Sequence, residues 1–219
     1  MNIKKNVNEV REKIEKIDKK SQCVDIVAAT KYANVEQMIS LYHNGIVKMG
    51  ENRVDALLSK RKMIDLPIEW HFIGTLQSRK VKDVINEIDF LHSLDRESVA
   101  KEIEKYRHEP LKCFIQVNIS GEETKHGLNP NKVASFLNDL KQYQKIEVIG
   151  LMTMAPNTED VQIIRSCFRN LKKLQEELTR HDEHFKTIKE LSMGMSNDYL
   201  IAIEEGSTHI RLGSVLFQD

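Results

Sequence analysis

Hydrophobic positions along the chain follow two different periods, and the two alternate. In residues 3–19 the apolar side chains recur with the spacing of one helix face, at Ile3, Val7, Val10, Ile14 and Ile17. Residues 24–31 then form a nearly continuous apolar run, which is typical of a strand buried on both faces of a parallel sheet. The pattern therefore predicts a leading helix followed by a buried strand.

The same alternation continues to the end of the chain. Segments with the helical period are expected at 34–44, 53–62, 78–87, 96–107, 130–143, 159–181 and 197–205. Short strand-like runs separate them, at 47–50, 70–74, 90–93, 112–119, 148–153, 188–193 and 209–213. Together with the first strand these make eight evenly spaced βα units of about 27 residues each, which fits a compact (β/α)8 barrel. We therefore predict an α/β fold, a TIM barrel with an extra N-terminal helix, and keep a doubly wound open sheet as the alternative.

Composition narrows the organisation and the environment of the protein. The four Pro and nine Gly are not clustered, so no linker is evident, and we expect one domain over residues 1–219. Lysine plus arginine and aspartate plus glutamate number 33 each, so no broad basic surface is implied and nucleic acid is not a favoured partner. The start has no apolar signal core and no run approaches the ~18 apolar residues of a membrane span.

The cysteines and histidines give little indication of a metal or a disulfide. The three cysteines, Cys23, Cys113 and Cys167, are odd in number and far apart, which argues for a reducing compartment and a cytoplasmic location. His181 and His184 have the spacing of one helix face, but they lie in a charged run, residues 180–184, that is more typical of a solvated helix end than of a metal site. We expect no metal site.

Two short Gly-Ser runs stand where a barrel of this kind often holds a phosphate, at the ends of the seventh and eighth strands. They are Ser192-Met-Gly-Met-Ser196 and Arg211-Leu-Gly-Ser214. At such places free backbone N–H groups converge, and glycine lets the backbone approach an anion closely. Each run alone is more typical of helix capping. Their position in the barrel favours a phosphate site formed by Ser196, Gly213 and Ser214.

Lys31 ends the first apolar strand, on the same rim as this phosphate site. A strand-end lysine usually just reaches water, but one that is desolvated and lacks a carboxylate partner is a nucleophilic amine. A neutral amine together with a phosphate cradle is what pyridoxal 5′-phosphate (PLP) requires. Arg211 then lies where it can point at the pyridine nitrogen and keep it unprotonated, although a salt bridge would explain an arginine there equally well.

Several segments resemble, in order, the signature segments of the pyridoxal phosphate homeostasis protein family. They are Val27-Ala-Ala-Thr-Lys-Tyr32, Gly50-Glu-Asn-Arg53, Trp70-His-Phe-Ile-Gly-Thr-Leu-Gln-Ser78, His92-Ser-Leu-Asp-Arg96, Gln116-Val-Asn-Ile-Ser-Gly-Glu122, Gly150-Leu-Met-Thr-Met-Ala-Pro156, Leu191-Ser-Met-Gly-Met-Ser196 and Arg211-Leu-Gly-Ser214. The resemblance covers nearly the whole chain. It implies a single-domain barrel similar to the N-terminal domain of alanine racemase, the fold-type III architecture.

The resemblance also implies roles for individual residues. Lys31 looks like the Schiff-base lysine that holds PLP covalently, and Asn52 looks like the residue near the cofactor ring. Arg211 is similar to the arginine that faces the ring nitrogen, while Ser196, Gly213 and Ser214 resemble the phosphate cradle. Two departures stand out: the family often has Thr at the position of Ser214, and it tends to continue past the eighth strand with a Gly and an Arg that this chain lacks.

Family members bind PLP and maintain vitamin B6 and amino-acid balance, with no established turnover, so we expect a non-catalytic carrier. The alternatives are a PLP-dependent amino-acid racemase and an interaction protein with a vestigial barrel that binds no chromophore. A racemase of this architecture takes its second base from an additional β-domain, and neither Tyr32 nor Tyr199 is an obvious substitute. The expected partners are PLP and, as candidate recipients, apo-forms of PLP-dependent enzymes, and the expected state is a monomer.

Overall fold

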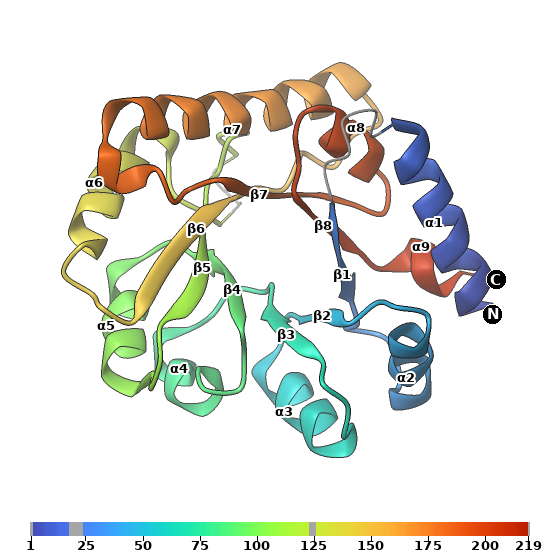
Figure 1. Ribbon diagram of the computed structural model, residues 1–219. Helices are drawn as coiled ribbons and strands as arrows, with labels where there is room; N and C mark the ends of the chain where they lie inside the picture. The colour runs from blue at the N-terminus through green and yellow to red at the C-terminus, as the bar shows by residue number, and fades with distance from the viewer. Residues whose placement is uncertain (1, 18–23, 123–125, 219) are drawn as a thin grey trace.

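The strands of the protein close into a barrel. The computed structural model describes residues 2–17, 24–122 and 126–218, and in these residues eight strands pair in chain order, every neighbouring pair parallel, with the first strand closing on the last (Figure 1). The strands are β1 (Asp25–Ala29), β2 (Lys48–Glu51), β3 (Glu69–Phe72), β4 (Phe90–Leu94), β5 (Leu111–Gln116), β6 (Ile146–Met152), β7 (Glu190–Met195) and β8 (His209–Leu212). The predicted barrel is confirmed, and the open sheet is wrong.

Helices surround the barrel on the outside, one after each strand. They are α1 (Ile3–Ile17), α2 (Val35–His43), α3 (Val54–Met63), α4 (Ser78–Val84), α5 (Glu97–Tyr106), α6 (Pro130–Leu140), α7 (Val161–His181), α8 (Tyr199–Glu204) and α9 (Ser214–Phe217), with a short 3₁₀ turn η1 (Glu183–Phe185). The leading helix and the seven helices between the strands lie where the hydrophobic period predicts them. The short α9 and η1 were not predicted.

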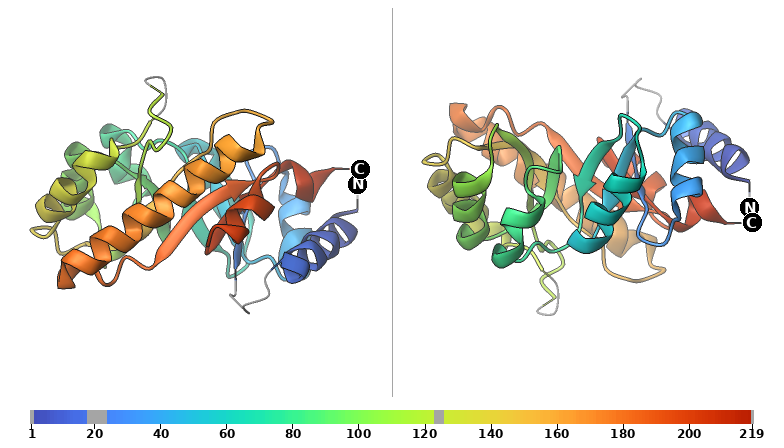
Figure 2. Two further views of the ribbon diagram at one scale, coloured as in Figure 1. Left: turned by 90° about the horizontal axis from the view of Figure 1, so that it is seen from above. Right: turned by 90° about the horizontal axis from the view of Figure 1, so that it is seen from below.

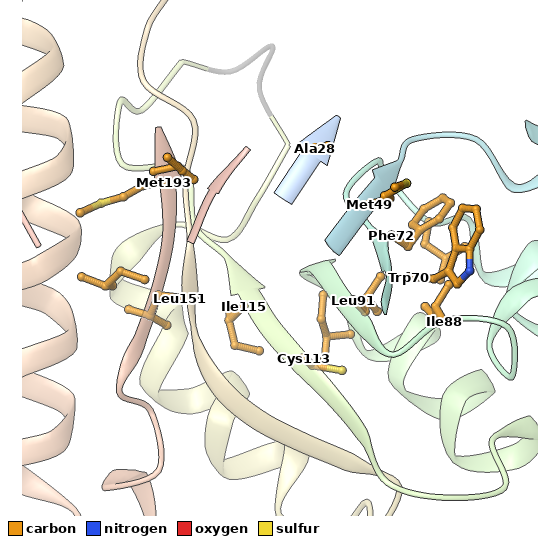
Figure 3. Packing of buried hydrophobic residues seen from close by; sticks show 14 of the residues in the cluster. Ala28, Met49, Trp70, Phe72, Ile88, Leu91, Cys113, Ile115, Leu151 and Met193 are labelled. Carbon is orange, nitrogen blue, oxygen red and sulfur yellow. The ribbon is translucent and has the colours of Figure 1, made fainter. Parts of the chain in front are cut away.

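Two separate apolar layers hold the barrel together. The larger one lies between strands and helices and includes the fully buried Trp70, Phe72 and Phe168; Figure 3 shows part of it, from Ala28 to Met193. The burial of each such side chain contributes roughly 1.5–3 kcal/mol. This layer explains why the strands read as continuous apolar runs, since their outward side chains are as deeply buried as those that point inward.

The smaller layer fills the barrel itself. It consists of Phe90, Phe114 and Met152, and the ring of His209 on β8 lies 5.1 Å from that of Phe114 on β5. Strands β5 and β8 are not neighbours in the sheet, so rings that meet between them must lie in the barrel interior. Histidines share this space with the phenylalanines, which gives the interior a polar component.

The end of the chain closes against its beginning. The side chain of Asn6 on α1 donates to the carbonyl oxygens of Leu216 at 3.2 Å and Gln218 at 2.8 Å, so α9 packs beside α1. Figures 1 and 2 show the two ends of the chain next to each other in every view. The residues after the eighth strand, which differ from the family pattern, thus form a short helix that α1 covers.

No helix in the described ranges combines the length and the apolar character needed to cross a membrane.

Of the cysteines, Cys113 is buried on β5, and burial raises the pKa of its thiol, so it is a poor nucleophile. Cys167 is buried on α7, and Cys23 lies outside the described residues.

Candidate functional site

The pairing of the first and last strands brings the predicted site residues to one rim. In the β1–β8 register Val27 faces Arg211 and Ala28 faces Leu212. The carbonyl oxygen of Ala29 accordingly lies only 3.6 Å from where a Cβ on Gly213 would stand. Lys31 follows two residues after Ala29, and Ser214 follows Gly213, so residues that are far apart in the sequence leave the barrel side by side at the carboxyl ends of the strands.

Lys31 lies in the turn after β1, and its side chain is exposed. Its Nζ lies over the ring of Tyr32, 4.7 Å from the ring centroid, and Tyr32 itself is 88% exposed. The desolvated amine that the buried strand led us to expect is therefore wrong for this structure. The physical reason is that the strand ends at Ala29, so the chain has left the barrel wall before it reaches Lys31.

A buried polar cluster forms around Thr30, the residue before Lys31. The Thr30 hydroxyl donates to Oε1 of Glu51 at 2.6 Å, and Nζ of Lys60 reaches the same oxygen at 2.6 Å and the Thr30 carbonyl at 2.7 Å. Glu51 is completely buried, and its Oε2 has no hydrogen-bond partner among the described residues. The cluster ties the ends of β1 and β2 to α3 and fixes the backbone just before Lys31.

Asn52 lies immediately after β2, with an exposed side chain beside the turn of Lys31. The end of β3 approaches it so closely that a Cβ on Gly74 would lie 2.3 Å from the carbonyl oxygen of Asn52. A side chain at position 74 would displace this backbone. Glycine at the end of β3 therefore allows Asn52 its place on the rim.

Backbone donors of the last turn converge on a single oxygen. Ser196 Oγ accepts hydrogen bonds from the N–H groups of Gly213 at 3.0 Å and Val215 at 3.4 Å. Ser214, between them, is the exposed first residue of α9. The structure thus brings Ser196, Gly213 and Ser214 together, and the N–H groups of Gly213 and Val215 converge on the Ser196 hydroxyl oxygen.

The end of β7 is shaped to carry Ser196. Gly194 has a positive φ of 96°, and a Cβ there would lie 2.6 Å from the Cβ of Ala202, so β7 and α8 can only pack this closely around a glycine. The N–H of Met195 donates to Oδ1 of Asp198 at 2.5 Å. Burial raises the pKa of Asp198, while its hydrogen bond from Met195 and the charge of Arg211 act in the opposite direction.

Arg211 lies beneath this rim, inside the barrel, and only 4% of it is exposed. Its Nη1 donates to Ser192 Oγ at 2.5 Å and its Nη2 to the carbonyl oxygen of Thr153 at 3.0 Å. No carboxylate of the described part of the chain forms a salt bridge with it, so the expected alternative of an ion pair is not observed. Burial lowers the pKa of Arg211 to about 10, which leaves it charged at neutral pH, with N–H donors to spare.

Sequence reasoning missed the polar groups that support these residues. Ser192 and the Thr153 carbonyl hold Arg211, and Glu51 and Lys60 hold the turn of Lys31. Alternation along the strands offered one signal, because Glu69 and His71, or Phe90 and His92, have the spacing of side chains on one face of a strand. Within the described residues we find no cluster of three or more histidine, cysteine, aspartate and glutamate side chains able to hold a metal.

Comparison with known proteins gives consistent results for sequence and fold. The sequence model of the family described as "Alanine racemase, N-terminal domain" matches residues 1–219. The pyridoxal phosphate homeostasis protein of Aquifex aeolicus is 37% identical over 225 residues, which cover 99% of this chain and 98% of that protein. The homologue of Vibrio cholerae, with the same name, is 33% identical over 227 residues, covering 98% of this chain and 95% of that protein.

The solved structures of PipY from Synechococcus elongatus PCC7942 have the same fold. The form without PLP superposes with a TM-score of 0.90 at 28% identity and the form with PLP bound with 0.88 at 26%, each covering 99% of this chain and 100% of PipY. An alanine racemase of Clostridium difficile 630 has a TM-score of 0.81 at 15% identity, covering 100% of this chain and 56% of that enzyme, and so shares the barrel. Together these matches show that the chain belongs to the pyridoxal phosphate homeostasis protein family.

Proposed function

We propose that this protein binds PLP at the rim of the barrel, as a Schiff base with Lys31, and takes part in keeping cellular PLP available without turning over a substrate. The observation that carries the proposal is the meeting of three unlike groups. An accessible amine, a pair of converging N–H groups and a buried guanidinium lie at the adjoining ends of β1, β7 and β8.

These groups match the three reactive parts of PLP. The aldehyde needs a primary amine, and Lys31 presents one in the open turn after β1. The phosphate needs several N–H donors, for which the N–H groups of Gly213 and Val215, with Ser196 and Ser214 beside them, are suited. An unprotonated ring nitrogen accepts a hydrogen bond, and the Arg211 guanidinium has further N–H groups besides the two that bind Ser192 and Thr153. Asn52 lies on the same rim and is suited to contact the ring.

The same residues favour holding PLP over using it. Bound PLP supplies an electron-withdrawing ring, and the ring withdraws electrons most strongly when its nitrogen carries a proton. Arg211 has no acceptor atom, so it can only donate to that nitrogen and leaves it unprotonated. Of the tyrosines considered as a second base, Tyr199 is only 4% exposed, and its buried hydroxyl has no hydrogen-bond partner in the part of the chain that the structure describes. Tyr32 follows Lys31 directly and is 88% exposed.

We further propose that residues 1–219 act as one PLP-binding barrel domain, as a cytoplasmic monomer that supplies PLP to apo-forms of PLP-dependent enzymes. A closed barrel has no free strand edge, which supports a monomer. Sedimentation of the purified protein tests the monomer. Transfer is tested by mixing the PLP-loaded protein with an apo-enzyme and following the recovery of its activity against an equal amount of free PLP.

Absorption spectroscopy tests the binding mode. PLP added to the wild-type protein should give a visible absorption band, Lys31→Ala should lose it, and Lys62→Ala, which removes an exposed lysine of α3, should keep it. Borohydride reduction followed by peptide mass spectrometry should place the label on Lys31. A label on another lysine, or a wild type without the band, would contradict the proposal.

Turnover is tested separately. The loaded protein is incubated with L-alanine and other amino acids, and the chirality of the solution is followed over time. We expect no rate above that of free PLP at the same concentration. A clear excess that disappears with Lys31→Ala would favour the racemase instead.

A further inference from the structure

An unbroken chain of hydrogen bonds crosses the barrel interior and ends at Arg211. Oε1 of Glu69 lies 2.9 Å from Nε2 of His71, whose Nδ1 lies 2.8 Å from Nε2 of His92. Nδ1 of His92 lies 2.8 Å from Ser192 Oγ, which accepts from Arg211 Nη1 at 2.5 Å. The chain starts at the first residue of β3 and runs through β4 to β7 and β8, on the other side of the barrel (Figure 1).

The chemistry of the two ends fixes the direction of every hydrogen bond between them. A carboxylate only accepts and a guanidinium only donates. If both imidazoles are neutral, Nε2 of His71 carries the proton that binds Glu69, so its Nδ1 accepts from Nε2 of His92. Nδ1 of His92 then accepts the proton of the Ser192 hydroxyl. Ser192 Oγ is left with its lone pairs towards Arg211, so each proton in the chain points towards Glu69.

Burial keeps the two imidazoles neutral and in place. His71 and His92 are both completely buried, and desolvation lowers the pKa of His71 and, more strongly, that of His92. The hydrogen bond from His71 lowers the pKa of the Glu69 carboxyl and keeps it ionised. Each ring also stacks on a phenylalanine with a centroid distance of 4.4 Å, His71 on Phe90 and His92 on Phe114. The rings therefore have one orientation.

Charged groups lie near both ends of this chain of hydrogen bonds, Glu69 and Arg211. Near Glu69, Nζ of Lys48 lies 3.7 Å from Oε1 and also pairs with Asp25. Besides desolvation, the charge of Asp89 acts to raise the pKa of His71, and that of His209 acts to lower the pKa of His92. Near Arg211 the one carboxylate that influences its pKa is Asp198, which makes no salt bridge with it in the described residues. Among the described residues, Arg211 donates to two acceptors, the Thr153 carbonyl oxygen and the Ser192 hydroxyl at the end of the hydrogen-bond chain.

We propose that His71 and His92 are positioning residues, which fix Ser192 as a hydrogen-bond acceptor and thereby hold the Arg211 guanidinium in one orientation beneath the rim. Hydrogen bonds linked in one direction polarise one another, so the anionic end at Glu69 strengthens the acceptor at Ser192. The consequence for PLP rests on the proposed function. An Arg211 held this way presents the same free N–H groups to a ring nitrogen at all times, whereas an unsupported guanidinium would rotate among acceptors.

The protein without PLP tests the chain directly. Long-range proton–nitrogen NMR correlations of the histidine rings should show His71 and His92 as neutral Nε2–H tautomers at neutral pH, and neither ring should become charged in the pH range in which an ordinary histidine does. A merely space-filling role would not fix these tautomers. A proton on Nδ1 of His92, or charging of either ring in this range, would overturn the proposal.

A substitution at the far end provides the second test. Glu69→Lys replaces an acceptor with a donor, and Glu190→Lys places the same charge change at another strand start, near His209 and outside the chain. In Glu69→Lys the Nε2–H population of His92 should fall and the Arg211 guanidinium signals should shift, while Glu190→Lys keeps both. An unchanged His92 tautomer in Glu69→Lys would overturn the proposal.

The PLP-loaded protein gives the functional outcome. Dissociation of PLP should be about three- to tenfold faster from Glu69→Lys than from Glu190→Lys, the factor expected when one hydrogen bond is weakened. Equal rates with altered tautomers would mean that the chain does not act on the cofactor. A wild type that binds no PLP would contradict the proposed function alone, because the tautomers are measured without PLP.

Discussion

The ammonium nitrogen of Lys60 lies 2.6 Å from Oε1 of Glu51 and 2.7 Å from the carbonyl oxygen of Thr30, the residue before Lys31. Glu51 is fully buried and the side chain of Lys60 is 13% exposed. One lysine of α3 therefore neutralises a buried carboxylate and holds the backbone from which another lysine extends. This contact fixes the part of the rim that carries Lys31.

Lys60→Met should lower the free energy of unfolding by ~3–5 kcal/mol, because it leaves the carboxylate of Glu51 buried without a counter-charge. Adding Glu51→Gln to it should restore part of the loss, since no charge then remains. Urea unfolding of the two single variants and the double variant measures the coupling. If the double variant loses the sum of the single effects, the two side chains do not act as a pair.

Ser196→Ala combined with Ser214→Ala should weaken PLP binding, because charge-assisted hydrogen bonds to the phosphate are worth ~1–3 kcal/mol each. Titration of PLP measures the dissociation constant, with inorganic phosphate as a competitor that reports on the phosphate site alone. Ser59→Ala, an exposed serine of α3, is the control. Unchanged affinity in the double variant would mean that the backbone N–H groups of Gly213 and Val215 bind the phosphate without these hydroxyls.

Arg211→Lys should lower the free energy of unfolding of the PLP-free protein by ~1–3 kcal/mol, because an ammonium cannot reproduce the planar fork that binds Ser192 and Thr153 together. The substitution should also weaken the binding of PLP. Arg61→Lys is the matched control, since Arg61 pairs with Glu87 on the surface, where a change of ~0.5 kcal/mol or less is expected. Equal thermal stability of the two variants would show that the fork contributes nothing.

The sequence was sufficient for the barrel because each strand and each long helix carries its own hydrophobic period. The four-residue α9 was missed because Ser214–Phe217 is about one helical turn, which is too short to show a hydrophobic period. The barrel rule also placed Lys31, Ser196 and Gly213 on one rim. Any residue that follows a strand must emerge there, so this part of the site needs no tertiary detail.

The support beneath the rim could not be predicted in this way. The contact between His92 on β4 and Ser192 on β7 depends on how far each strand is shifted along the barrel. That shift is a property of the closed sheet and not of either strand. The exposure of Lys31 was missed because the run that predicts the strand extends to residue 31, whereas the strand ends at Ala29. The boundary is set by the turn to Ala33, whose N–H binds the carbonyl of Thr30 at 2.9 Å.

The buried histidines should make the protein less stable in mild acid. Desolvation lowers the pKa of His71, His92 and His209 in the folded state, that of His209 to about 4, from an ordinary value of 6.5. Between these values the unfolded chain binds protons that the folded protein excludes. Their contribution to stability is therefore complete above about pH 6.5 and is lost as the pH falls, by up to ~1.4 kcal/mol per pH unit for each histidine.

Urea unfolding at a series of pH values from 8 to 4.5 measures this loss. Asp198 works against it, because burial raises its pKa, but a carboxyl group titrates mainly at the acid end of the range. His92→Phe should reduce the slope between pH 6.5 and 5 by about one proton's worth, ~1.4 kcal/mol per pH unit, since one excluded proton is removed. A wild-type stability that is flat between pH 7 and 5 would mean that the interior histidines accept protons in the fold, and the one-directional chain to Arg211 would then be lost as well.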